Sequence, residues 1–305
     1  MRFSIGLPTD KVQYGDEFVG QRAITEMARA AEDAGFDACH VTDHPFPSDR
    51  WMRAGGHHAH DPFVSLAFAA AVTTTLKLQT NIVVLPYRNP FLLARSVASL
   101  DSLSDGRLIL GAAVGYLKAE FKALGVDFEA RNELTDEAIL ALKAALTQDV
   151  TEFEGSGFEA LGNVMLPKPV QQPHPPLWIG GNSRRAIRRA VEHGQGWLPF
   201  RSPAVLSRTS RTAQLDSLEE LARRIEYLNE HARQVGRSEP LDIAFTPLTS
   251  YLTGGDFSAS AVLDEIPALA ELGVTWLIAG VPCTSRAEFI QGAHRFGTEV
   301  IRRAG

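Results

Sequence analysis

The 305-residue sequence contains little cysteine: Cys39 and Cys283 are its two thiols, and they lie far apart. A disulfide-stabilised scaffold needs several cysteines, so we expect two buried thiols in a reducing compartment. No apolar run is long enough to cross a bilayer, and the amino terminus has no long apolar segment of the secretory kind. We therefore expect a cytoplasmic protein with no membrane partner.

The sequence also lacks an excess of basic residues, because 30 Lys and Arg stand against 36 Asp and Glu for a formal charge of -6. This balance argues against a nucleic-acid partner. A glycine-rich dinucleotide fingerprint is missing too, which argues against a doubly wound nucleotide-binding sheet. Hydrophobic residues make up 45% of the chain, enough for an ordinary globular core.

What the sequence does contain is an alternation of strand and helix patterns along almost its whole length. Start signals precede several helices, such as Asn89-Pro90, Ser183 and the capping boxes Ser217-x-x-Glu220 and Ser285-x-x-Glu288. Successive strands joined by helices should be parallel, with right-handed crossovers. Eight strands are predicted, over residues 3–7, 36–42, 78–85, 108–114, 177–181, 197–200, 241–245 and 274–279.

Eight such units without a linker predict an α/β fold of the closed (β/α)8 TIM-barrel type, forming a single domain over residues 1–305. Residues 149–176 interrupt the alternation with three glycines and five prolines. We interpret them as an insertion between strands four and five that contains a hairpin or an extended segment.

Polar and small residues gather at the carboxyl ends of the third and fourth predicted strands, where α/β folds place their sites. Asn81 lies among apolar residues, and Gly111 to Gly115 leave the fourth strand with little side-chain bulk. Either a flat ligand lies there, or the small residues let the following helix pack closely.

Five segments in order along the chain carry a family resemblance: Thr-Asp-His at 42–44, Thr-Asn-Ile-Val-Val-Leu-Pro-Tyr-Arg-Asn-Pro at 80–90, Leu-Asp-Ser-Leu-Ser-Asp-Gly-Arg-Leu-Ile-Leu-Gly at 100–111, Gly-Tyr at 115–116 and Trp-Ile-Gly-Gly-Asn-Ser at 178–183. Together they resemble the luciferase-like monooxygenase family, and within it the branch of oxidoreductases that depend on the deazaflavin coenzyme F420. The resemblance covers nearly the whole chain.

The resemblance implies an enzyme that transfers a hydride between coenzyme F420 and a small organic substrate, and we expect a homodimer. One alternative is a monooxygenase that uses reduced FMN and molecular oxygen, which the same scaffold supports. Another is a flavin-binding protein without catalysis. The identity of the substrate should depend on loops such as residues 46–60 and 199–216.

Family members bind the flavin or deazaflavin ring at the carboxyl end of the barrel, against a bulge in strand three. The matching bond here is Asn81-Ile82, which is often cis in the family. Asp43 and His44 match positions beside the reactive edge of the ring, so they are the catalytic candidates. His44 could transfer a proton as the hydride moves, and Asp43 could orient His44 or bond to the ring. The alternative for His44 is a structural histidine.

A glycine-rich turn follows strand five and opens a helix, a combination that suits phosphate because the first amides are free and the dipole is positive. In the family the matching turn contacts the phosphate-bearing tail of the cofactor. The cofactor-binding candidates there are Gly180, Gly181, Asn182 and Ser183. Gly115, Tyr116 and Trp197 are further cofactor candidates; for Tyr116 and Trp197 the alternative is core packing.

Two other groups of polar residues have less specific interpretations. His57, His58 and His60 lack the paired spacing of a zinc site, so we predict no metal and a substrate-facing or solvated loop. Four arginines, at 184, 185, 188 and 189, could attract an anionic tail, but a solvated helix face is the simpler interpretation.

Overall fold

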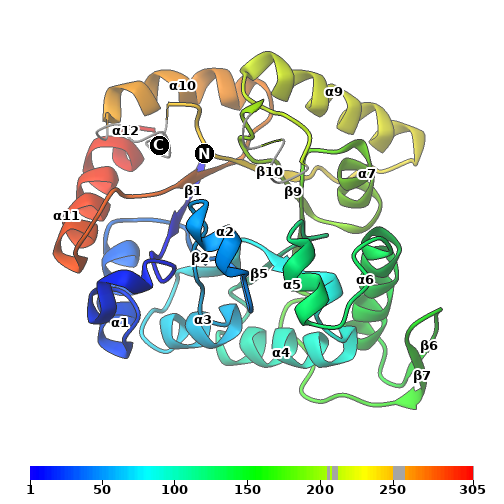
Figure 1. Cartoon of the computed structure of the whole chain (residues 1–305). Helices are drawn as coiled ribbons and strands as arrows, with labels where there is room; N and C mark the ends of the chain where they lie inside the picture. Colours follow the sequence, from blue (N-terminus) through cyan, green and yellow to red (C-terminus); the bar gives the residue numbers. More distant parts are fainter. Residues whose placement is uncertain (205–206, 208–211, 250–257, 305) are drawn as a thin grey trace.

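The computed structural model describes residues 1–204, 207, 212–249 and 258–304 of the chain. Its centre is a closed barrel of eight parallel strands with helices around the outside (Figure 1). One strand is split, so nine segments build the barrel: β1 (Arg2–Gly6), β2 (Ala38–Val41), β3 (Lys77–Thr80), β4 (Val83–Val84), β5 (Leu108–Ala113), β8 (Leu177–Gly180), β9 (Gly196–Leu198), β10 (Asp242–Phe245) and β11 (Trp276–Ala279). The predicted (β/α)8 barrel is confirmed.

The third strand, predicted over residues 78–85, consists of β3 and β4 with the expected bulge between them, and it ends before residue 85 because the chain turns at Leu85–Tyr87. The Val84 amide donates to Asp43 Oδ2 at 3.1 Å, and Pro86 has no N–H to donate to a neighbouring strand. β3 and β4 both pair with β5, which keeps the barrel closed across the break.

The helices begin largely where the capping signals predicted. The side chains of Asn89, Ser183, Ser217 and Ser285 each accept a hydrogen bond from an amide of the first turn. The helices are α1 (Gln21–Asp33), α2 (Asp49–Arg53), α3 (Pro62–Ala70), α4 (Pro90–Leu103), α5 (Lys118–Ala123), α6 (Arg131–Thr147), α7 (Arg184–His193), α9 (Leu218–Gln234), α10 (Ala259–Glu271), α11 (Arg286–Phe296) and α12 (Arg302–Ala304), with a π-helical turn at Gly297–Ile301.

The hydrophobic core has two layers, one on each side of the barrel wall. The larger layer lies between the strands and the outer helices, and it includes the buried Cys39 and Cys283, both with free thiols. The smaller layer fills the barrel interior, where the rings of Trp178 and Trp276 meet edge to face at 5.2 Å. Among the helices that the structure describes, none has the length and apolar character of a membrane-spanning segment.

The expected insertion contains an antiparallel hairpin of β6 (Thr151–Glu154) and β7 (Glu159–Asn163). Figure 1 shows this hairpin outside the ring of helices, beyond α6. The shorter helices α2 and α5 instead lie nearer the centre of that view than α1, α3, α4 and α6. Both α2 and α5 follow the carboxyl ends of strands, β2 and β5, and so lie near the predicted site.

Candidate functional site

A cavity of about 860 Å³ lies at the carboxyl ends of the barrel strands. This is the end where (β/α)8 barrels place their sites, because the loops after each strand meet there. The structure brings ten of the eleven predicted site residues to the wall of this one cavity: Asp43, His44, Asn81, Ile82, Gly115, Tyr116, Gly180, Gly181, Asn182 and Ser183.

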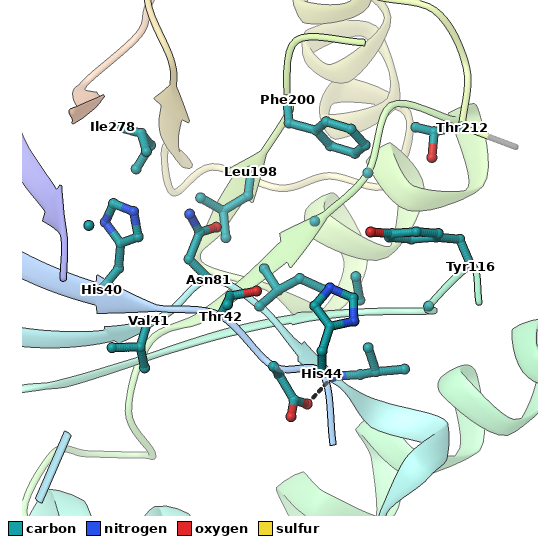
Figure 2. A pocket seen from close by; sticks show the side chains of 18 of the residues that line it. His40, Val41, Thr42, His44, Asn81, Tyr116, Leu198, Phe200, Thr212 and Ile278 are labelled. Atoms are coloured by element: carbon teal, nitrogen blue, oxygen red, sulfur yellow. Dashed lines mark hydrogen bonds between the residues drawn. The ribbon is translucent and has the colours of Figure 1, made fainter. Parts of the chain in front are cut away.

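His44 follows β2 and is buried, with its imidazole directed toward the middle of the cavity opposite Tyr116 (Figure 2). Its Nδ1 lies 3.4 Å from Oε2 of Glu120, a fully buried carboxylate on α5. The other oxygen of Glu120 accepts the amide of Phe46 at 3.0 Å, and the Tyr87 hydroxyl donates to Oε2 at 3.0 Å. Glu120 therefore orients His44 and leaves Nε2 of the ring for the cavity.

Asp43 does not orient His44, which corrects one of the two roles that the sequence suggested for it. Its carboxylate forms a two-bond ion pair with Arg88, at 2.6 and 2.9 Å, and also accepts the Val84 amide. A paired carboxylate of this kind holds backbone in place, here joining the end of β2 to the segment after β3. Arg88 lies within the segment 80–90 that carries the family resemblance, but its pairing with Asp43 was not predicted.

Two tyrosines near His44 keep their protons at ordinary pH. Burial, with the nearby Glu120 carboxylate, raises the pKa of Tyr116 to about 12. The same two causes also raise the pKa of Tyr87. Both phenols are therefore hydrogen-bond donors, and Tyr116 offers its donor at the cavity wall.

The predicted loop over residues 46–60 folds back onto His44. The rings of Trp51 and His57 lie 4.6 and 4.7 Å from the His44 ring, and 5.3 Å from each other. Gly56 is required next to them, because a Cβ there would lie 2.4 Å from the Trp51 ring. His57 also lines the cavity, so this loop faces the site and is not merely solvated.

The bulge expected in strand three is present, and the Asn81-Ile82 peptide bond is cis. The Asn81 amide nitrogen of the backbone donates to Val41 O at 2.8 Å, which fixes the bulge to β2. The Asn81 side chain points into the cavity (Figure 2). Within the described part of the chain, no hydrogen bond to protein occupies that side-chain amide.

The turn of residues 180–183 opens α7 as expected. Gly181 has φ +121°, a backbone conformation that other residues rarely adopt. The Ser183 hydroxyl accepts the Ala186 amide at 3.1 Å, so it caps the helix and keeps its own O–H for a ligand. The Asn182 side chain bonds to Phe200 N, Phe200 O and Ala213 O, and its backbone carbonyl oxygen accepts from Arg224 Nε, so only its backbone N–H remains for a ligand.

Trp197 does not reach the cavity wall, which favours the core-packing alternative for this residue. Its side chain is fully buried, and the indole N–H donates to Gly181 O at 2.9 Å. Trp197 thus supports the 180–183 turn from behind.

The glycines of β5 and of the turn after it leave space for neighbouring protein atoms. This favours close packing over a flat ligand as the reason for their small size. A Cβ on Gly111 would lie 2.0 Å from Thr80 O. At Gly115, where φ is +81°, a Cβ would lie 2.5 Å from Val84 and 3.0 Å from Phe121. Gly115 still lines the cavity through its backbone.

The arginines of α7 do not form a uniformly solvated face. Arg189 is only 4% exposed and pairs with Asp136 and Asn132 of α6, while Arg185 bonds to Glu133 and Asp136. These contacts join α7 to α6, and none of the four arginines itself lines the cavity.

Several cavity residues were not identified from the sequence. Arg131 and Asn132 at the start of α6 line the cavity, as do Lys11 and His40. Burial lowers the pKa of His40 to about 4, so its ring is neutral, with Nδ1 3.0 Å from the Ser4 hydroxyl. No signal pointed to these residues, because helix starts and strand interiors with such residues are common.

Within the described residues, no group of three or more His, Cys, Asp or Glu is arranged to hold a metal ion.

Comparisons with known proteins agree with this geometry. An uncharacterised protein of Mycobacterium tuberculosis is 29% identical over 272 residues, which cover 85% of each chain. The structure of the coenzyme F420-dependent tetrahydromethanopterin reductase from Methanopyrus kandleri matches with a TM-score of 0.75 at 20% identity, covering 99% of each chain. The oxygenating constituent of 3,6-diketocamphane monooxygenase from Pseudomonas putida, solved with FMN, matches with a TM-score of 0.76 at 16% identity, over 99% of this chain and 98% of that one.

At these identities the structural matches establish the fold alone. The decisive comparison is with the family model for luciferase-like monooxygenases, which matches residues 1–262. With the barrel, the bulge after β3 and the cavity at the carboxyl end in agreement, this chain belongs to the luciferase-like monooxygenase family.

Proposed function

We propose that this chain is an oxidoreductase that transfers a hydride between coenzyme F420 and a small organic substrate. The observation that carries the proposal is His44, held by Glu120 with its Nε2 facing a cavity large enough for a cofactor and a substrate together. The sequence resembles the F420-dependent branch, and one structural neighbour is described as an F420-dependent reductase.

The residues of the cavity fit a deazaflavin or flavin ring with a phosphate-bearing tail. The Asn81 side-chain amide has no protein partner among the described residues and points into the cavity, as a residue that bonds to a polar ring edge would. At the far wall, the 180–183 turn presents the first amides of α7 and the free O–H of Ser183. Arg131 adds a positive charge to the same wall.

When bound, the deazaflavin would supply the site of hydride exchange. The protein's own part is to hold the two reactants close together and to manage the accompanying proton. In this proposal Asn81 and Ile82 support the ring, while Gly115 and Tyr116 border it. Gly180, Gly181, Asn182 and Ser183 hold the phosphate, the last two through backbone amides and the Ser183 hydroxyl. His44 gives or takes the proton.

The second candidate is a monooxygenase that uses reduced FMN and molecular oxygen. It is favoured by the structural neighbour from Pseudomonas putida, which was solved with FMN in the same fold. A flavin-binding protein without catalysis is less well supported, since binding alone does not require a buried carboxylate that orients His44 toward the cavity.

Separate titrations of the purified protein with F420 and with FMN test the assignment. We expect F420 to bind at least about tenfold more tightly, a difference of about 1.4 kcal/mol in binding free energy. Fluorescence titration or equilibrium dialysis measures both affinities, and riboflavin, which lacks the phosphate, is the control for the tail. Equal affinities, or FMN retained through purification, would favour the monooxygenase.

The homodimer and the cytoplasmic location stay predictions. Sedimentation of the purified protein checks the first, and fractionation of the source cells checks the second.

A further inference from the structure

The loop after β2 places a second imidazole against His44. The rings of His44 and His57 are 4.7 Å apart between centroids and nearly perpendicular, at 84°. Trp51 touches both rings, at 4.6 and 5.3 Å, so the arrangement is held by three side chains in mutual contact. The catalytic assignment above uses His44 and leaves His57 without a role.

The hydrogen bond of His57 decides which of its nitrogens carries the proton. Nδ1 lies 3.1 Å from the backbone carbonyl oxygen of His58. A carbonyl oxygen can only accept, so Nδ1 carries the hydrogen, and Nε2 of the neutral ring is an acceptor. Burial lowers the pKa of His57, and the neighbouring His44 lowers it further, so the ring is neutral at ordinary pH.

The same reasoning applies to His44. Its Nδ1 faces the carboxylate of Glu120, which accepts, so the hydrogen of the neutral ring lies on Nδ1 and Nε2 is an acceptor. Two neighbouring rings thus offer unprotonated nitrogens at one cavity wall. Within the described residues, neither Nε2 has a protein partner.

Exposure differs between the two rings. His44 is 8% exposed, so it cannot exchange a proton freely with bulk water. His57 is partly exposed and belongs to a surface loop whose next residue, His58, is exposed. His57 therefore lies between the buried ring and the solvent.

We propose that His57 is a proton carrier that exchanges the proton of His44 with the solvent during turnover. This inference rests on the proposed hydride-transfer function. No direct hydrogen bond joins the two rings, so in this proposal a water molecule passes the proton between their Nε2 atoms, and one water is an accepted bridge in proton transfer.

The relay can be written out for a substrate that carries a C–H and an O–H bond on one carbon, because its oxidation releases both a hydride and a proton. With a bound coenzyme as the two-electron oxidant, the C–H bond of that carbon would break as a hydride passes to the coenzyme. The O–H bond breaks, C=O forms, and the proton goes to Nε2 of His44. Before the next turnover that proton passes through water to Nε2 of His57 and then to the solvent.

The charged and titratable groups around the two rings are consistent with one shared proton. Glu120 and the neutral phenol of Tyr116 face His44 from α5 and from the turn after β5. Asp10 faces His57 from the loop after β1, and His58 adjoins it in its own loop. The carboxylates favour a proton on the pair, and the mutual repulsion of the two rings disfavours a second one.

His57→Asn tests the relay, because the asparagine amide keeps an N–H donor for the His58 carbonyl but cannot carry a proton. We expect kcat to fall by about tenfold or more in dilute buffer, with cofactor affinity unchanged. Added imidazole should restore most of the rate, because a free base then replaces the missing one. His58→Asn is the matched control, an exposed neighbour with its carbonyl intact, and should keep the wild-type rate.

A second measurement needs no cofactor. In the isotope-labelled free protein, the His57 ring is titrated by NMR in the wild type and in His44→Asn. We expect the pKa of His57 to rise in the variant, because the electrostatic effect of the neighbouring imidazole, which lowers that pKa in the wild type, is then absent.

The outcomes separate this inference from the proposed function. If wild-type protein turns over with neither F420 nor FMN, the proposed function fails, while the NMR comparison still judges the coupling of the rings. The relay is refuted if His57→Asn matches the wild-type rate in dilute buffer, if imidazole leaves the variant's rate unchanged, or if His57 titrates identically with and without His44.

Discussion

Glu120 is the residue on which the candidate site depends most, after His44 itself. It is fully buried, and its two oxygens accept from Phe46 N and Tyr87 Oη and face His44 Nδ1. A buried carboxylate with its lone pairs used in this way fixes the imidazole in one orientation and one tautomer. The carboxylate thus determines which nitrogen of His44 is available for chemistry.

We expect His44→Ala to lower turnover far more than cofactor affinity. General acid or base catalysis contributes about a hundredfold to ten-thousandfold, whereas one neutral hydrogen bond to a cofactor contributes about 1 kcal/mol. Turnover should fall at least about a hundredfold, and affinity should change by less than about tenfold. Steady-state kinetics and a cofactor titration on the same preparation measure the two effects.

His58→Ala, an exposed change in the neighbouring loop, is the control and should leave both quantities near their wild-type values. If His44→Ala instead lowers rate and affinity by similar small factors, His44 is only part of the cavity wall. The proton would then have to be carried by another group at the cavity, such as Tyr116.

At the scale of elements, one side chain of α1 holds the segment that leads into β3. Oε1 of Glu32, near the end of α1, accepts the backbone amides of Thr74, Thr75 and Leu76 at 2.8, 2.6 and 3.0 Å. Burial by itself raises the pKa of Glu32, but these hydrogen bonds outweigh it and lower the pKa to about 2. The charged form of Glu32 therefore stabilises the start of β3, which leads to the bulge at Asn81.

Glu32→Gln should lower the free energy of unfolding at neutral pH, because an amide oxygen accepts less strongly than a carboxylate. The folded-state pKa lies below the ordinary value of 4.5, so the wild-type advantage is complete above that pH. It should shrink as the pH falls from about 4.5 toward 2, where the folded carboxyl takes up its proton. Urea unfolding of both proteins at several pH values measures the difference.

Glu154→Gln makes the same chemical change at an exposed position of the hairpin and serves as the control. It should alter neither the stability nor its pH dependence. A Glu32→Gln deficit of constant size across the acid range would show that the carboxylate charge contributes nothing.

At the scale of the whole molecule, the barrel closes without the insertion. The strand order and the pairing of β3 with β5 complete the ring, and among the strands that the structure describes, β6 and β7 pair only with each other. Glu137 of α6 holds the hairpin by accepting from Ser156 Oγ and from the amides of Gly157 and Phe158. This arrangement supports the proposal of one barrel domain that carries an insertion.

Replacing residues 151–163 with a short Gly-Ser linker should therefore preserve the barrel and its cofactor site. We expect the cofactor affinity to stay within about threefold of wild type, under about 0.7 kcal/mol. The thermal midpoint should fall by a few degrees, because Phe91 loses its ring contacts with Phe153 and Phe158. Circular dichroism and the cofactor titration check both expectations.

Glu137→Gln, which weakens the hairpin anchor without removing the segment, is the intermediate control. Loss of the barrel or of cofactor binding in the linker variant would show that the insertion belongs to the structural core.

The sequence by itself determined the alternation of strands and helices, the helix starts and the end of the barrel that carries the site. These features depend on local physics: an Asn or Ser caps the helix that follows it, and an apolar run covered on both faces becomes a parallel strand. His44 and the 180–183 turn come at the end of a strand of predictable direction, whereas Asn81 lies within a predicted strand and is identified by its polar side chain and by the family resemblance.

Only the tertiary structure decided which side chains meet around those positions. Glu120 lies 76 residues from His44 along the chain, and nothing local distinguishes it from the other acids of a helix. Trp197 turned to Gly181 because closing the barrel fixes the direction of each side chain along a strand, and Asp43, just beyond β2, met Arg88 because closure brings the segment after β4 beside it. The partners of a residue in a barrel are set by strand register across the ring, which is a property of the closed sheet and of no single segment.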